Sequence, residues 1–299
     1  MIQRYESRFL LLVALGLSAS ASGAQAQRGQ ILEGQILHSE VLGRDWPYTV
    51  YLPSDYASSE RSYPVVYLLH GLGGDHTGWI RRGDASMTAD SLIAASAIPQ
   101  IIMIIPDGFV RSMWVDSDPE TGFGAVETAF MQDLVPHVDG AYRTIPTRDA
   151  RMIGGLSMGG YGALRLAFKY PEAFGAVAAL SPAIWRTFPQ GPPVGDEPPT
   201  PAFGVPFDPA RWEAETPWAY IPNLVANAGT APLQVYLSAG DDDPFHQLID
   251  GTTDLYLTLR AADIKAELRI TDGGHTWAVW DAALADVLPF FADVIRRRR

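Results

Sequence analysis

The chain has 299 residues, a formal net charge of −12 at pH 7 and no cysteine. The absence of cysteine excludes disulfide bonds and thiolate metal sites, and the negative charge argues against a nucleic-acid partner, whose phosphates would be repelled. About 270 residues beyond the N-terminal leader described next are enough for one hydrophobic core.

Residues 1–26 have the pattern of a secretory signal peptide. After a weakly basic start, the apolar run at 9–17 is too short to span a bilayer, and Ala24-Gln25-Ala26 matches an A-x-A cleavage site. We expect cleavage near Ala26 and a secreted or periplasmic protein without a stable membrane anchor. An uncleaved membrane anchor is the alternative.

Residues 27–299 alternate strand-like and helix-like segments, which predicts a single α/β domain with a mostly parallel sheet. The pattern gives about eight strands with helices on both faces. An antiparallel pair is expected at 36–42 and 48–52, followed by strands at 65–69, 101–105, 152–153, 177–180, 235–237 and 266–270. Helices are expected at 86–97, 126–142, 158–170, 248–262 and 276–295.

A proline-rich segment at about 182–222 interrupts this alternation. Proline at this density is not expected to continue a helix or an inner strand, so we predict an irregular insertion. Long insertions inside compact domains are functional or mobile. Because this one follows the strand after the glycine-rich turn at 154–160, it is either a lid over the site or a mobile surface insertion.

The glycine-rich turn Gly154-Gly155-Leu156-Ser157-Met158-Gly159-Gly160 follows a strand-like run and precedes a helix-like run. In that context the pentapeptide G-x-S-x-G predicts a nucleophile elbow, a sharp strand-to-helix turn that exposes the hydroxyl of Ser157. Glycine suits so tight a turn because a side chain would clash with neighbouring backbone. The alternative is a turn that only packs a helix on the sheet.

A serine nucleophile needs a general base, and the chain has six histidines. His275 follows the last predicted strand, and such loops gather at the carboxyl edge of a parallel sheet, where Ser157 also lies. His246 is the competitor, since its loop reaches the same edge. An orienting carboxylate is expected within Asp241-Asp242-Asp243, because the order serine, acid, histidine is that of the α/β-hydrolases.

An oxyanion needs two hydrogen-bond donors. One is the backbone N–H of Met158, next to the nucleophile, and the second is expected in the loop 69–74, where a buried strand opens into a glycine-rich turn. His70 in this loop is expected to support it by hydrogen bonding. Tryptophans in predicted loops near these segments either stack on a sugar or phenolic acyl group or pack the proline-rich segment; they are Trp79, Trp114, Trp185 and Trp277.

Together these motifs resemble the esterase D-like, feruloyl esterase-like branch of the α/β-hydrolases. The resemblance runs from about residue 48 to 280 and includes His70-Gly71-Leu72-Gly73-Gly74, Pro106-Asp107-Gly108, the serine turn and Gly273-Gly274-His275-Thr276-Trp277. That branch contains feruloyl and acetyl xylan esterases, S-formylglutathione hydrolases and mycolyltransferases.

The resemblance implies a serine esterase that acts on carboxylic esters through an acyl-enzyme, with no metal or other cofactor. It implies Asp243 as the triad acid, with Asp242 in reserve, and the N–H of Leu72 as the second oxyanion donor. The expected substrates are small or polysaccharide-linked esters, such as feruloyl, acetyl-xylan or other short-acyl esters. A mycolyltransferase-type acyltransferase and a non-catalytic carbohydrate-binding homologue are the alternatives.

Overall fold

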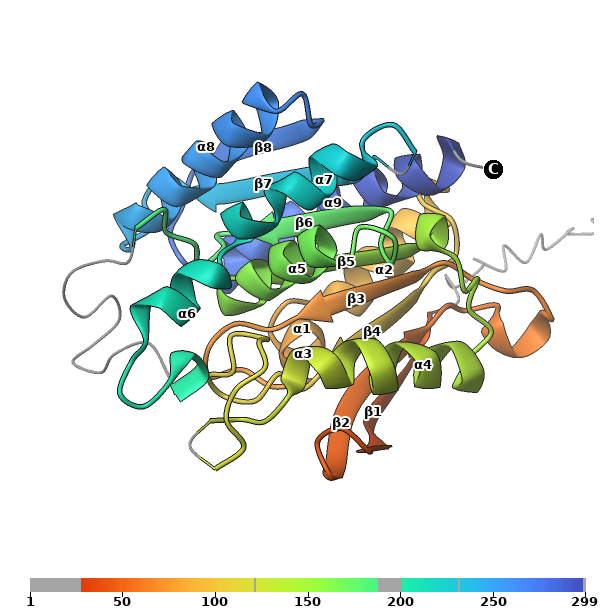
Figure 1. Cartoon of the computed structure of the whole chain (residues 1–299). Helices are drawn as coiled ribbons and strands as arrows, with labels where there is room; N and C mark the ends of the chain where they lie inside the picture. Colours follow the sequence, from red (N-terminus) through yellow and green to blue (C-terminus); the bar gives the residue numbers. More distant parts are fainter. Residues whose placement is uncertain (1–27, 121, 188–200, 231, 298–299) are drawn as a thin grey trace, which may run out of the picture.

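An eight-stranded sheet runs through the centre of the protein (Figure 1), as described by a computed structural model for residues 28–120, 122–187, 201–230 and 232–297. Its strand order is β1-β2-β4-β3-β5-β6-β7-β8. The pairs β1/β2 and β2/β4 are antiparallel and all others are parallel. The strands are β1 (Gln30–Ser39), β2 (Arg44–Leu52), β3 (Val65–Leu69), β4 (Ile102–Pro106), β5 (Arg151–Leu156), β6 (Ala176–Leu180), β7 (Gln234–Gly240) and β8 (Ala266–Thr271).

Helices cover both faces of the sheet (Figure 1). The helices α1, α2 and α9 contribute to one hydrophobic cluster, and α3, α4, α5, α7 and α8 contribute to the other. The α-helices are α1 (Gly78–Arg81), α2 (Ala85–Ala94), α3 (Val126–Ala129), α4 (Val135–Ala141), α5 (Met158–Lys169), α6 (Pro209–Ala214), α7 (Ile221–Asn227), α8 (His246–Ala261) and α9 (Trp277–Arg297). Shorter turns of helix are η1 (Tyr56–Ser58), η2 (Phe130–Leu134), η3 (Arg148–Ala150), η4 (Pro201–Phe203) and η5 (Pro217–Tyr220).

The inner strands read as continuous apolar runs because each is buried on both faces. In β3, Val65, Tyr67 and Leu69 belong to the cluster that contains α5, while Val66 and Leu68 belong to the cluster that contains α9. This alternation follows from the two-residue repeat of a strand. The predicted α/β architecture with a mostly parallel sheet is therefore confirmed.

Two predicted elements differ from the structure. The first strand covers Gln30–Ser39 instead of 36–42, and it contains an irregularity between Leu32 and Gln35. The helix predicted at 126–142 is interrupted by a π-helical turn at Phe130–Leu134. Pro136 explains the interruption, since it lacks the N–H that a continuous α-helix would require and clashes with the preceding turn.

The proline-rich segment was predicted to be irregular, and this is wrong for its second half. That half contains η4, α6, η5 and the start of α7. Pro209, Pro217 and Pro222 occupy the first turns of α6, η5 and α7, where a missing N–H breaks no intrahelical hydrogen bond. Residues 188–200 of the segment lie outside the described part of the chain.

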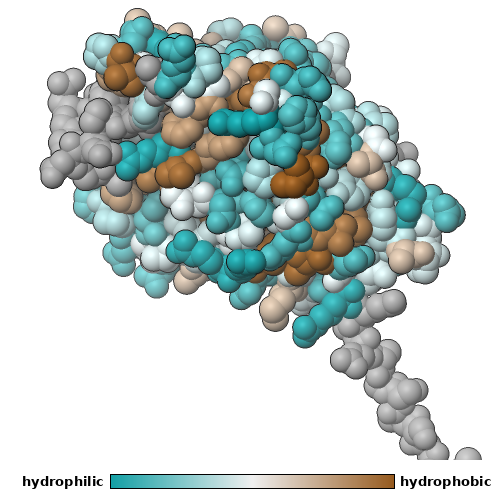
Figure 2. Space-filling view, turned by 90° about the horizontal axis from the view of Figure 1, so that it is seen from below, coloured by the Kyte–Doolittle hydropathy of each residue, from teal (hydrophilic) through white to brown (hydrophobic). Residues whose placement is uncertain are grey.

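The predicted signal peptide, residues 1–26, also lies outside the described residues. Within the part of the chain that the structure describes, none of the helices combines the length and the apolar character that crossing a membrane requires. Figure 2, seen from below Figure 1, shows separate hydrophobic patches between hydrophilic residues on that face. The exposed apolar side chains Leu72, Val110 and Val205 come from three different segments.

Candidate active site

Ser157 forms the turn between β5 and α5. Its backbone has φ 52° and ψ −117°, a conformation that costs free energy for a residue with a side chain. Neighbouring backbone holds it in place: the N–H of Ser157 donates to the carbonyl of Leu180 at 2.8 Å, and the N–H of Ala183 donates to the carbonyl of Ser157 at 2.9 Å. The turn is thus fixed by the end of β6 and by the residues just after it.

Two glycines make this turn possible. A Cβ atom on Gly159 would lie 2.2 Å from the carbonyl oxygen of Leu69, and one on Gly155 would lie 2.3 Å from the carbonyl oxygen of Gly159. Both distances are far shorter than a van der Waals contact. The glycines therefore allow β5, α5 and the end of β3 to meet closely around Ser157.

The structure brings Ser157, His275 and Asp243 together at the carboxyl edge of the sheet. The Nε2 atom of His275 lies 2.9 Å from the Oγ atom of Ser157, and its Nδ1 atom lies 2.7 Å from the Oδ2 atom of Asp243. Asp243 is fully buried, and its Oδ1 atom accepts a hydrogen bond from the backbone N–H of Phe245 at 2.9 Å. An ionised carboxylate only accepts, so Nδ1 carries a proton and Nε2 is free to accept one from Ser157.

The other acids of the Asp241-Asp242-Asp243 run are exposed. Asp241 accepts a hydrogen bond from the N–H of Gly273, and Asp242 donates its own N–H to the carbonyl of that glycine. Asp241, Asp242 and Asp272 each place a carboxylate oxygen within 4.8 Å of the others. Exposed acidic groups of this kind are common on protein surfaces, and we assign no metal to them.

The remaining histidines lie elsewhere. His246, the predicted competitor, begins α8 and is exposed. His38 faces Asp45, His76 faces the hydroxyl of Thr49, and His137 faces the hydroxyl of Tyr48. His275 is therefore the histidine that the structure places against Ser157.

The loop after β3 packs directly against the serine turn. A Cβ atom on Gly71 would lie 3.3 Å from the Cβ atom of Ser157, so Leu72 follows a residue in contact with the nucleophile candidate. On the other side, Met158 occupies the first position of α5, where backbone N–H groups have no intrahelical partner. The predicted oxyanion donors, the N–H groups of Leu72 and Met158, thus belong to the two segments that border Ser157.

His70 fixes this loop as a neutral imidazole. Its Nε2 atom accepts the backbone N–H of Gly108 at 2.7 Å, so its Nδ1 atom carries the proton and donates to the carbonyl of Gly71 at 2.8 Å. Burial lowers the pKa of His70, which favours the neutral form. The side chain is fully buried and links the loop after β3 to the loop after β4.

The tryptophan prediction is wrong for two of the four residues. Trp79 and Trp114 are fully buried, so neither offers a ring face to a substrate. Trp114 fills a slot left by glycines, since a Cβ atom on Gly108 or Gly162 would lie 2.2 or 2.6 Å from its side chain. Trp185 and Trp277 are only partly buried, and their contact with substrate stays a prediction.

A buried ionic cluster, which the sequence analysis did not identify, joins the insertion to α5. It consists of Arg165, Glu127 and Glu215, in which Arg165 pairs with both carboxylates. The side chains of Arg165 and Glu127 are 0% and 1% exposed. Tyr161 adds a hydrogen bond of 2.6 Å from its hydroxyl to the carbonyl of Glu215. A lone arginine within the small and apolar residues of α5 was the available sequence signal.

The charge state of this cluster follows from its contacts. Burial raises the pKa of Glu127, but the charges of Arg165 and Lys169 and the hydrogen bonds from Lys169 and Tyr170 outweigh burial and hold that pKa below its usual range.

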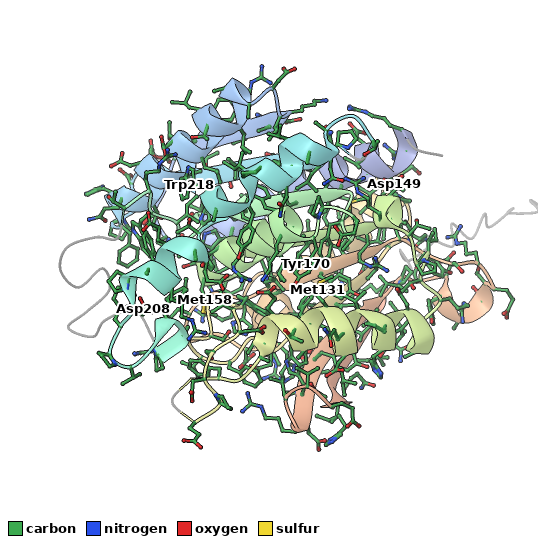
Figure 3. All side chains as sticks on the ribbon, in the orientation of Figure 1. Met131, Asp149, Met158, Tyr170, Asp208 and Trp218 are labelled. Atoms are coloured by element: carbon green, nitrogen blue, oxygen red, sulfur yellow. The ribbon has the colours of Figure 1, made fainter. Side chains whose placement is uncertain are left out.

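Figure 3 labels Tyr170 near the middle of the molecule. It also labels Met158, Asp208 and Trp218 toward the side where the insertion lies, and the carboxylate of Asp208 caps α6 by accepting N–H groups of Ala210 and Arg211.

Comparisons with known proteins agree with this fold. Residues 39–291 match the model of the Esterase family, which is described as "Putative esterase". The chain is 31% identical over 261 residues to Esterase Rv1288 of Mycobacterium tuberculosis, covering 80% of this chain and 54% of that protein. It is 26% identical over 307 residues to the diacylglycerol acyltransferase/mycolyltransferase Ag85B of Mycobacterium leprae, covering 93% of this chain and 88% of that protein.

A solved structure of a ferulic acid esterase superposes with a TM-score of 0.75 at 28% identity, covering 90% of this chain and 99% of that one. The chain thus belongs to the Esterase family, and the predicted α/β-hydrolase fold is confirmed. The chain spans about half the length of the mycobacterial esterase it matches.

Proposed function

We propose that this protein is an exported serine esterase that hydrolyses carboxylic esters through an acyl-enzyme. The observation that carries the proposal is the pair of hydrogen bonds from Ser157 through His275 to the buried Asp243. Family membership supports the same reaction class. No metal or other cofactor takes part in the proposed reaction.

In the proposed mechanism, the Oγ atom of Ser157 attacks the ester carbonyl carbon while Nε2 of His275 takes its proton. Asp243 accepts the hydrogen bond from Nδ1–H and stabilises the imidazolium. The N–H groups of Leu72 and Met158 stabilise the negative oxygen of the tetrahedral intermediate. His275 then protonates the leaving alcohol, and in the second half it deprotonates a water that attacks the acyl-enzyme and releases the acid.

The first test compares Ser157→Ala and His275→Ala with the wild type in hydrolysis of p-nitrophenyl acetate. We expect each substitution to lower kcat by about 10⁴-fold or more, because the nucleophile and base act as one unit. Ser238→Ala, a substitution of another buried serine on β7, two strands away from β5, is the control and should keep wild-type activity. Wild-type-like turnover by Ser157→Ala would contradict the mechanism.

We propose a short-acyl or phenolic ester as the substrate, either free or linked to a polysaccharide. The likeness to a ferulic acid esterase supports this proposal. Methyl ferulate, acetylated xylan and p-nitrophenyl esters of increasing chain length would be compared by kcat/KM. The highest value should fall on the ferulate or on the acetyl esters, and a preference for long acyl chains would contradict the assignment.

Acyl transfer to a sugar or lipid alcohol is a second candidate. The likeness to the mycolyltransferase extends over 93% of this chain and supports it. The same acyl-enzyme serves both reactions, and the acceptor decides between them. Product analysis in the presence of trehalose or glucose should give mainly free acid, whereas mainly acyl-sugar would favour the transferase. A non-catalytic, carbohydrate-binding homologue would fail to react with a fluorophosphonate probe.

We also propose that export removes residues 1–26. The carboxylate of Asp90 accepts hydrogen bonds from the N–H of Gly29 at 2.9 Å and from the hydroxyl of Tyr51 at 2.7 Å. These bonds attach the start of the mature chain to the domain, which supports cleavage just before Gln27. Intact mass and N-terminal sequencing of the protein recovered outside the cytoplasm should show a chain that starts at Gln27. A full-length chain there would contradict the proposal.

A further inference from the structure

His275 makes edge-to-face contacts with two aromatic side chains. The ring of Phe245 lies 5.1 Å from the imidazole at an interplanar angle of 89°, and the ring of Trp280 lies 4.9 Å away, also at 89°. These contacts come from the loop after β7 and from α9. Perpendicular packing at this separation is the favoured geometry of aromatic pairs.

The contact with Trp280 continues into a row of rings. Trp277 packs on Trp280 at 5.5 Å and 84°, and Trp79 packs on Trp277 at 5.5 Å and 89°. We call Phe245, His275, Trp280, Trp277 and Trp79 the aromatic row. Its members come from three separate parts of the sequence, yet each ring stands nearly perpendicular to the next.

Hydrogen bonds attach the aromatic row to the strand ends that border the site. The indole N–H of Trp79 donates to the carbonyl of Leu69 at 3.0 Å, where β3 opens into the loop that carries Leu72. The indole N–H of Trp280 donates to the hydroxyl of Ser181 at 3.2 Å, directly after β6. The row therefore connects the histidine to the oxyanion loop and to the strand beside the serine turn.

The proposed reaction requires a fixed orientation of the His275 imidazole. Its Nδ1 hydrogen bond to Asp243 fixes one point of the ring, and Nε2 must also stay on the oxygen of Ser157 within a few tenths of an ångström. A single hydrogen bond leaves the ring able to tilt about that point. Side chains packed perpendicular to the imidazole oppose this tilt, and Trp280, which is 6% exposed, also keeps water from that side.

We propose that Trp280 and Phe245 are positioning residues that hold His275 in its reactive orientation. The inference rests on the proposed function, since it concerns the same serine, histidine and acid. Neither side chain carries a group that exchanges a proton in the reaction. Their contribution is to the position of the base, so it belongs to kcat and not to the binding of the ester.

The test compares Trp280→Leu and Trp280→Phe in hydrolysis of p-nitrophenyl acetate. Leucine removes the ring, and we expect kcat to fall about 10- to 100-fold while KM stays within twofold, as for a small misplacement of a reacting group. Phenylalanine restores a ring, and we expect it to recover kcat to within a few-fold of the wild type. Partial unfolding would also lower the apparent kcat at an unchanged KM, so kcat is measured well below each variant's melting temperature and is expressed per folded protein.

Phe291→Leu is the matched control. Phe291 lies on the same helix and in the same hydrophobic cluster, is 1% exposed, and is not a member of the aromatic row. We expect it to lower the melting temperature while kcat stays within twofold of the wild type. Should Trp280→Leu not fold, Phe245→Leu provides the same comparison from a partly buried position.

The outcomes separate this inference from the proposed function. A wild type that neither hydrolyses esters nor reacts with a fluorophosphonate probe would overturn both. An active wild type with unchanged kcat in Trp280→Leu and Phe245→Leu would overturn the positioning role alone. A KM that rises while kcat is kept would also overturn it, since that result would make these side chains part of ester binding.

Discussion

Replacing Asp243 by asparagine tests the proposed mechanism most sharply, because both oxygens of this carboxylate have a defined partner. The Oδ2 atom faces Nδ1 of His275 at 2.7 Å, and the Oδ1 atom accepts the N–H of Phe245 at 2.9 Å. Both partners are donors. An ionised carboxylate satisfies two donors at once, whereas an amide has one accepting oxygen and one donating nitrogen.

Either orientation of the amide is unfavourable. If its oxygen stays on the N–H of Phe245, its NH₂ group faces Nδ1 and forces the imidazole proton onto Nε2, which can then no longer accept the proton of Ser157. If the amide turns around, its NH₂ group meets the N–H of Phe245, and a buried donor is left unsatisfied at a cost of about 1–3 kcal/mol. We expect kcat to fall about 10³- to 10⁴-fold, which corresponds to about 4–5.5 kcal/mol.

The assay is p-nitrophenyl acetate hydrolysis by Asp243→Asn, with Asp242→Asn as the matched control. Asp242 is the adjacent residue, its side chain is exposed, and the substitution removes the same charge. The control should keep kcat within twofold. A kcat within tenfold of the wild type for Asp243→Asn would refute Asp243 as the triad acid. A large loss of kcat for Asp242→Asn would assign that role to Asp242.

Three further predictions concern stability and the serine turn. Glu127→Gln leaves Arg165 buried with less compensating charge, so urea unfolding at pH 7 should show a free energy of unfolding about 3–5 kcal/mol lower than that of the wild type. A decrease below about 1 kcal/mol would contradict a stabilising role of the ionic cluster. Folding lowers the pKa of Glu127, so the stabilisation by its charge is present above the unfolded pKa and is lost as pH falls through the folded pKa. The difference in unfolding free energy between the wild type and Glu127→Gln should therefore narrow below about pH 4. A difference that widens at low pH would contradict a lowered pKa for Glu127. Gly159→Ala places a Cβ atom 2.2 Å from the carbonyl oxygen of Leu69 and should lower kcat/KM at least about tenfold, as expected for a misplaced reacting group. The control Gly140→Ala on α4 meets nothing within 4 Å and should leave kcat/KM unchanged. Equal effects of the two substitutions would contradict the close approach of α5 to the end of β3.

The sequence was most informative where strands are buried on both faces. The runs at 65–69 and 101–105 became β3 and β4 to within one residue at each end, and the run at 235–237 lies inside the longer β7, because a strand in the middle of a parallel sheet needs apolar side chains in succession. The candidate site followed from the same reasoning, since loops after parallel strands meet at one edge. Ser157 and His275 are therefore predicted to lie close together.

Other features depend on contacts between distant segments and were not predictable from local pattern. The burial of Trp114 depends on Gly108 and Gly162, which come from a loop and a helix and leave room for its ring. The choice between Asp242 and Asp243 depends on which of two adjacent side chains turns inward, and no periodicity distinguishes them. Arg165 is a charged residue within an apolar helix and pairs with Glu127 and Glu215. Both glutamates are far from Arg165 in sequence, so no local pattern predicts the cluster.

The close contact between His275 and Ser157 also has a consequence for the order of events during folding. The two residues are 118 positions apart, and β6 and β7 must pair between their strands before the imidazole can reach the hydroxyl. Contacts of such long range form late, since their loop entropy has to be overcome first. A refolding chain that has already formed β3, β5 and β6 has a nucleophile without a base. Recovery of the proposed esterase activity would therefore mark the moment when the last strand docks, later than the collapse seen by tryptophan fluorescence.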